Sequence, residues 1–149
     1  MSQSLSKIIL HLVFSTSYRQ NLIPTEALQD VHAYIAGLLR GIGSEAYRVG
    51  GTEDHVHIAC TLPRTMTTSQ LVQEVKASSS KWIKERTGQG VFSWQSGYGA
   101  FSLGHSQLGS LIRYIENQQE HHQKVSFEKE LIAFLSKYRI DHDEKYLWD

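Results

Sequence analysis

The periodicity of apolar residues changes along this chain in the order strand, helix, strand, strand, helix, strand. Lys7 to Thr16 is rich in β-branched and aromatic residues, which is typical of a central, largely buried strand. Thr25 to Leu39 repeats apolar residues at helical spacing, and Gly41 ends the pattern. The same reasoning predicts strands at 44–50, 55–62 and about 98–103, a turn at 50–52, and a second helix at 69–86.

This order of elements predicts an α+β fold with the ferredoxin-like split βαβ topology. There, an antiparallel four-stranded sheet carries two helices on one face, and its first and third strands are the central pair. The 149 residues suit a single domain, 1–149, whose ferredoxin-like core occupies 1–104. A further helix is predicted at about 106–123, and a C-terminal helix and tail at about 126–149.

Charge and cysteine content restrict the functional classes. Lys plus Arg equals Asp plus Glu at 15 each, so net charge gives no general attraction to nucleic acid, although a local basic surface would still bind phosphates. Cys60 is the single cysteine and is expected to be a small buried residue in a reducing compartment. With no apolar run long enough for a membrane span and no charged-then-apolar leader, a cytoplasmic protein is expected.

The stretch from Glu53 to Cys60 contains a pair of histidines at strand spacing. His55 and His57 point to one face of a strand, and the intervening Val56 points to the other. Neighbouring imidazoles on a rigid strand can bind one divalent metal ion, but two solvated or core histidines fit the same pattern. Asp54 belongs to the opposite face and is expected in the turn or in support of a ligand, and His11 is expected in the core or near the same site.

The predicted helix from Ser106 to Gln123 places three functional groups on one side. Tyr114, Gln118 and His121 project in similar directions along successive turns. A tyrosine packed at the rim of the apolar stripe is the alternative interpretation. The spacing alone leaves both readings open.

Several basic residues are candidates for contacts with DNA phosphates. Arg19 follows Tyr18 in a polar loop after the first strand, and such loops can clamp a nucleic-acid backbone. Lys76, Ser80 and Lys84 share one face of the predicted helix 69–86, with Lys81 nearby. An ordinary solvated helix face explains this ladder equally well.

Taken together, these motifs resemble the HUH endonuclease superfamily, and specifically its single-tyrosine transposases of the insertion sequence 200/605 class. The resemblance rests on an ordered set of strings that covers nearly the whole chain. The set comprises His11-Leu12-Val13-Phe14, Tyr18-Arg19, His55-Val56-His57, Gly97-Tyr98-Gly99-Ala100-Phe101-Ser102, Tyr114-Ile115-Glu116-Asn117-Gln118, Gln119-Glu120-His121-His122 and Tyr146-Leu147-Trp148.

The resemblance implies a DNA-cleaving site. His55, His57 and Gln118 would hold Mg²⁺ or Mn²⁺, and Tyr114 would attack a phosphodiester of single-stranded DNA to form a 5′-phosphotyrosine link. Such a ligand set carries no negative charge, so its affinity for Mg²⁺ without DNA is expected to be poor. The sequence does not identify the base that deprotonates Tyr114.

The resemblance also implies partners. The substrate would be single-stranded DNA with a hairpin, and the protein would be a homodimer in which Tyr114 of one subunit acts with His55 and His57 of the other. Gly104, ten residues before Tyr114, would then be the hinge.

Two alternatives to a mobile-element transposase remain. One is a domesticated relative that processes repeated palindromes. The other is a non-catalytic nucleic-acid-binding ferredoxin-like module, which zero net charge favours slightly. The C-terminal helix and tail are expected to pack on the body of the protein, with a role in covering the site or a dimer seam as the alternative.

Overall fold

The computed structural model describes residues 2–143 and 147 of the chain. Its sheet has four antiparallel strands in the order β2-β3-β1-β4, so β3 and β1 are the central pair. This order confirms the predicted split βαβ topology. The strands are β1 (Ile9–Ser15), β2 (Ala46–Thr52), β3 (His55–Thr61) and β4 (Gly99–Leu103).

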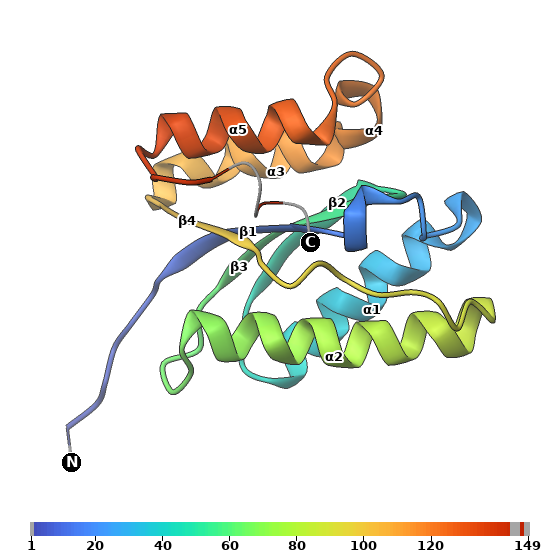
Figure 1. Ribbon diagram of the computed structural model, residues 1–149. Coiled ribbons are helices and arrows are strands. Elements are labelled where there is room, and N and C mark those ends of the chain that lie inside the picture. Colours follow the sequence, from blue (N-terminus) through green and yellow to red (C-terminus); the bar gives the residue numbers. More distant parts are fainter. Residues whose placement is uncertain (1, 144–146, 148–149) are drawn as a thin grey trace.

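Helices cover both faces of the sheet (Figure 1). Helices α1 (Leu28–Gly41) and α2 (Thr68–Thr87) lie together on one face, as the topology requires. Helices α3 (Leu108–Glu116), α4 (Gln118–His121) and α5 (Phe127–Lys137) lie over the other face. Short 3₁₀ turns occur at Ser17–Arg19, Thr25–Ala27 and His105–Gln107. Among the described residues, no helix combines the length and apolar character that crossing a membrane requires.

Successive side chains of the central strands point to opposite faces of the sheet, so they contribute to two different buried layers. Leu12 and Phe14 of β1 and Ile58 of β3 belong to the core beneath α1 and α2. Cys60 lies in the same core, fully buried, and burial raises the pKa of its thiol to about 11, which fits a structural residue. The intervening residues of both strands face α3 and α5, so His55 and His57 share that second buried layer.

The β2–β3 hairpin differs from the predicted one. The turn was expected at 50–52, but β2 continues to Thr52, which pairs with His55, and the turn comprises Glu53 and Asp54. Gly51 has a φ of 147°, and a Cβ there would lie only 2.3 Å from the carbonyl oxygen of His55. The glycine is therefore needed for the close approach of the two strands and not for the turn.

The helix predicted at 106–123 is interrupted. α3 ends at Glu116, and Asn117, with a ψ of 17°, separates it from α4. The apolar stripe of α3 packs on the sheet through Leu108 and Ile115. Near the C-terminus, the carbonyl of Leu147 accepts a hydrogen bond of 2.8 Å from Gln95 Nε2, so the tail contacts the body at this residue. Tyr146 and Trp148 lie outside the described residues.

Candidate active site

The two strand histidines lie at the centre of the sheet beneath α4 and α5. Both side chains are completely buried. His55 Nε2 lies 2.8 Å from Gln118 Oε1, which comes from the start of α4. The structure therefore brings together the three residues that the family resemblance assigned to a metal site.

Both ring nitrogens of His55 have polar partners. Its Nδ1 lies 2.7 Å from Asp54 Oδ1, so Nδ1–H donates to that carboxylate. Burial acts to raise the pKa of Asp54, but hydrogen bonds from His55 and Thr52 outweigh it and lower that pKa. In the neutral ring, Nε2 then faces the amide oxygen of Gln118 as an acceptor. Two facing acceptors need a proton or a cation between them, which fits a metal site.

Glu130 of α5 reaches the centre of this group. Its Oε1 accepts a hydrogen bond of 2.7 Å from His57 Nε2, and its Oε2 accepts one of 3.2 Å from Gln118 Nε2. Tyr114 Oη donates to the same Oε2. The sequence analysis did not predict this residue, because an acidic side chain in the first turn of a helix is common for helix capping alone. The available signal was its position beside Leu131 on the apolar stripe of α5.

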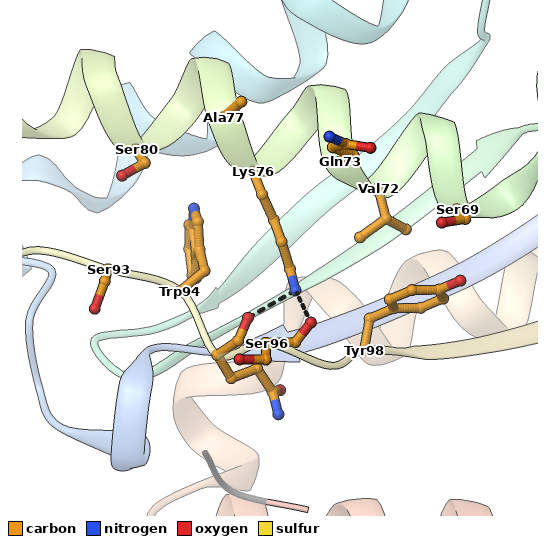
Figure 2. A pocket seen from close by; sticks show the side chains of 11 residues that line it. Ser69, Val72, Gln73, Lys76, Ala77, Ser80, Ser93, Trp94, Ser96 and Tyr98 are labelled. Carbon is orange, nitrogen blue, oxygen red and sulfur yellow. Dashed lines mark hydrogen bonds between the residues drawn. The ribbon is translucent and has the colours of Figure 1, made fainter.

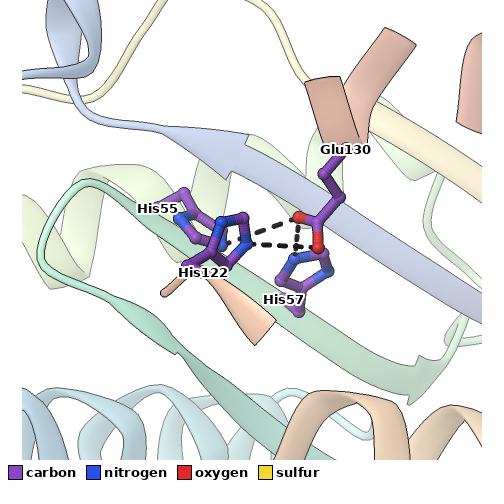
Figure 3. A group of neighbouring side chains, drawn as sticks. All are labelled: His55, His57, His122 and Glu130. Carbon is purple, nitrogen blue, oxygen red and sulfur yellow. Dashed lines mark hydrogen bonds and ion pairs between the residues drawn. The ribbon is translucent and has the colours of Figure 1, made fainter. Parts of the chain in front are cut away.

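His122 completes a group that can hold a metal ion (Figure 3). His55, His57, His122 and Glu130 each offer one ligand atom, and these atoms lie within 4.8 Å of one another. His122 Nε2 is buried and lies 3.2 Å from Glu130 Oε2, but it has no hydrogen-bond partner within the described part of the chain. Burial acts to lower the pKa of His122, but its contact with Glu130 outweighs it and raises that pKa, and a divalent cation bound there would replace the imidazole proton. Imidazole and carboxylate ligands therefore fit a divalent ion.

Burial and hydrogen bonding set the protonation states in the site. Burial lowers the pKa of His57 to about 4, although Glu130 acts in the opposite direction. Burial acts to raise the pKa of Glu130, but its interactions with His122, His57 and Tyr114 outweigh it and hold the pKa well below the usual range. Burial and the Glu130 charge raise the pKa of Tyr114. At neutral pH the site thus contains a neutral His57, a carboxylate and a phenol.

Tyr114 lies beside the histidines of its own chain. Its ring centroid is 5.7 Å from that of His57, and its hydroxyl is 3.4 Å from His121 Nε2. The tyrosine also lines a cavity of about 490 Å³ together with His11, Lys137 and other residues of β4, α3 and α5. The predicted nucleophile therefore lies at a cavity, and a second cavity of about 410 Å³ reaches the site beside Asp54 and His122.

The predicted hinge residue is part of an ordered turn. Gly104 caps the 3₁₀ turn His105–Gln107, and its N–H donates a hydrogen bond of 2.9 Å to Gln107 Oε1. Any residue can adopt its φ of −79°, so the backbone does not require a glycine at this position. The arrangement in this single chain needs no exchange of α3, and a hinge at Gly104 stays a prediction.

The predicted DNA contacts occupy two different environments. Lys76 extends from α2 toward residues 93–98 in a cavity of about 480 Å³ (Figure 2). Its ammonium donates to the carbonyls of Gln95, Ser96 and Gly97 at 2.7, 3.3 and 2.7 Å, and burial lowers its pKa to about 8. Lys81 and Lys84 are exposed on α2.

Arg19 contacts the helix that carries Glu130. Its guanidinium forms an ion pair with Glu128 of α5. Tyr18 and Arg19 have positive φ angles of 55° and 56°, so the loop is held in an uncommon backbone conformation. Through this ion pair, Arg19 connects the loop after β1 to α5, the helix that lies over the two strand histidines.

Comparison with known proteins agrees with this architecture. The family model described as "Transposase IS200 like" matches residues 4–118. A comparison with curated proteins gives no match. A candidate transposase from Deinococcus radiodurans R1 has a similar structure, with a TM-score of 0.61 and 19% identity over 79% of this chain and 98% of that one.

A second similar structure is that of a REP-associated tyrosine transposase bound to a REP hairpin. Its TM-score is 0.57, and it is 19% identical over 84% of this chain and 76% of that one. At 19% identity, these two structures establish only a shared fold. The family model matches residues 4–118, which is most of the chain, and therefore establishes the family. The chain belongs to the IS200-like transposase family.

Proposed function

We propose that the protein is a metal-dependent transposase that cleaves and rejoins hairpin-bearing ends of single-stranded DNA. Tyr114 is the nucleophile, and His55, His57 and Gln118 hold a Mg²⁺ or Mn²⁺ ion. The observation that carries the proposal is the convergence of these four side chains from β3, α3 and α4 on one buried point. An ion there would polarise the scissile phosphate and stabilise charge on its oxygens.

The chemistry follows from the position of the Tyr114 hydroxyl. Its oxygen attacks phosphorus, a Tyr–O–P bond forms, and the P–O3′ bond breaks. The DNA retains a free 3′-OH on one side and a 5′-phosphotyrosine on the other. The phenol donates a hydrogen bond to Glu130 Oε2, so a carboxylate lies where the phenolic proton must go. Attack of a different 3′-OH on the phosphotyrosine reverses the step and joins new strands.

A similar structure supports the substrate, whereas the assembly is proposed on the family resemblance alone. The similar REP-associated transposase is bound to a hairpin, which favours hairpin DNA as the ligand of this chain. A homodimer with sites assembled in trans is the assembly that we test. A mixture of Tyr114→Phe and His57→Ala proteins should cleave DNA only if one subunit supplies the tyrosine and the other the histidines. Inactivity after verified subunit exchange would favour the arrangement within one chain.

A covalent adduct is the decisive measurement. The protein is incubated with Mn²⁺ and single-stranded hairpin DNA from the gene's flanks, labelled at its 3′ end so that the 5′-phosphotyrosine fragment carries the label. The wild-type chain should yield a labelled protein band, and Tyr114→Phe should yield none. Tyr34→Phe removes a hydroxyl from α1, on the other face of the sheet, and serves as the matched control. Equal adduct with Tyr114→Phe would refute the proposal.

A domesticated enzyme that processes repeated palindromes is the second candidate, because the similar structure holds a REP hairpin. It would form the same adduct on palindromes dispersed elsewhere. Paired hairpins at both ends of the gene would instead indicate a mobile element. Binding of hairpins without any adduct would indicate a non-catalytic module.

A further inference from the structure

The carboxylate of Glu130 occupies the centre of the histidine group without a fixed cation beside it. Its side chain is only 2% exposed. Oε1 lies 2.7 Å from His57 Nε2 and 3.7 Å from His55 Nε2. Its described neighbours within ion-pair distance are histidines, with no lysine or arginine among them.

A buried carboxylate in this position needs positive charge. Asp54 adds a second carboxylate behind His55. Burying a charge is unfavourable unless it is paired or bound to a metal ion. Besides the groups that donate hydrogen bonds to Glu130, three potential ligand atoms face the same point, namely His55 Nε2, the Gln118 oxygen and His122 Nε2. Lone pairs and negative charge that converge in this way fit a cation.

The two oxygens of Glu130 face different partners. Oε1 faces the ring nitrogens of His55 and His57, and Oε2 faces Tyr114 and Gln118. One oxygen can therefore bind an ion held by the strand histidines while the other keeps the tyrosine hydroxyl in place. Carboxylate oxygen is also the ligand type that Mg²⁺ and Mn²⁺ prefer over neutral imidazole.

We propose that Glu130 is the anionic ligand of the metal site, and that it lets the chain bind Mn²⁺ in the absence of DNA. This inference rests on the metal site of the proposed function and changes its ligand set. Glu130 lies beyond the residues 4–118 that match the family model, so α5 supplies a ligand from outside the matched region. It also replaces the expectation that a ligand set without charge would bind metal poorly before DNA arrives.

The test measures Mn²⁺ binding to the full chain without DNA, by the loss of the free-ion EPR signal. Wild-type protein should bind one Mn²⁺ per chain. Glu130→Gln keeps the shape and removes the charge, and it should weaken Mn²⁺ binding by at least about tenfold. Glu128→Gln removes the same charge from a half-exposed position on the same helix, so its Mn²⁺ affinity should equal that of the wild type. Equal affinities for wild type and Glu130→Gln would overturn the inference.

A second measurement needs no variant. Wild-type chain carrying ¹³C at the glutamate carboxyl carbons is loaded with Mn²⁺, and electron–nuclear double resonance detects a carboxylate bound directly to the ion. A strong ¹³C coupling supports the inference, and its absence overturns it even if Glu130→Gln does not fold.

Tyr114→Phe separates the two proposals, because it should bind Mn²⁺ but form no DNA adduct. Adduct formation by wild type together with unchanged Mn²⁺ binding by Glu130→Gln refutes the ligand role alone.

Discussion

His11 Nε2 lies 2.7 Å from His57 Nδ1, and the two rings stack with centroids 5.0 Å apart. The β1–β3 register pairs His11 with Ala59 and Val13 with His57, so the histidines are diagonal neighbours on the same face. The contact orients the imidazole of His57 so that Nε2 points at Glu130. The buried His11 thus holds the proposed ligand His57 in its orientation. Hydrogen bonds from residues outside the ligand set commonly orient metal ligands in this way.

Replacing His11 should therefore weaken metal binding without removing a ligand. His11→Ala removes the hydrogen bond to Nδ1 and the stacked ring, so Mn²⁺ affinity should fall by about 10- to 100-fold. Titration with Mn²⁺ measures the change. His32→Ala, on α1 across the sheet, should leave Mn²⁺ affinity unchanged. An affinity of His11→Ala equal to that of wild type would show that His57 needs no such support.

Gly50 allows α3 to lie close to β2. A Cβ at this position would lie 2.7 Å from Ile115 Cγ2 and 2.9 Å from the Ile115 carbonyl oxygen. Gly50→Ala should lower the free energy of unfolding by about 1–3 kcal/mol and displace Gln118, three residues after Ile115. Urea denaturation and Mn²⁺ titration measure the two effects. Gly37→Ala, which meets nothing within 4 Å in α1, should instead be neutral or stabilise by up to about 1 kcal/mol.

Phe127 forms the cover of the site. Its ring stacks on His55 with centroids 4.4 Å apart and an interplanar angle of 24°, and the side chain is 3% exposed. Phe127→Ala should lower the free energy of unfolding by about 3–5 kcal/mol, because it leaves a cavity over the histidine. Leu5→Ala, at a residue 87% exposed, should change it by less than about 0.5 kcal/mol. Chemical denaturation of both variants checks the difference.

The lysines of α2 should differ in their effect on DNA binding. Lys84 is exposed, so Lys84→Gln should weaken hairpin binding and reduce the slope of log K against log salt by about 0.7–0.9 if it contacts one phosphate. The Lys76 ammonium is held by three carbonyls, so Lys76→Gln should chiefly lower stability and leave that slope unchanged. Fluorescence anisotropy across a salt series measures both slopes. A reduced slope for Lys76→Gln would indicate that its ammonium leaves the carbonyls to meet DNA.

Local periodicity predicted where several residues of the candidate site lie, although the family resemblance alone implied their roles. The alternation around Val56 placed both flanking histidines on one face, and the order of elements placed their strand beside β1. The spacing along α3 and α4 brought Tyr114 and Gln118 to the same side, although the helix is interrupted at Asn117. The turn at 50–52 was wrong because the glycines there serve a close approach of strands, which a local pattern does not distinguish from a turn.

The sequence by itself determined the order of elements that makes a split βαβ topology and the shared face of His55 and His57, because periodicity and strand geometry are local properties of the chain. Tyr114 was singled out only by the resemblance to a known family. Only the tertiary structure decided that α5 lies over this face and that Glu130 and His122 join the site. Glu130 is 73 residues from His57, and periodicity fixes which side of a helix is apolar but not which surface that side will cover.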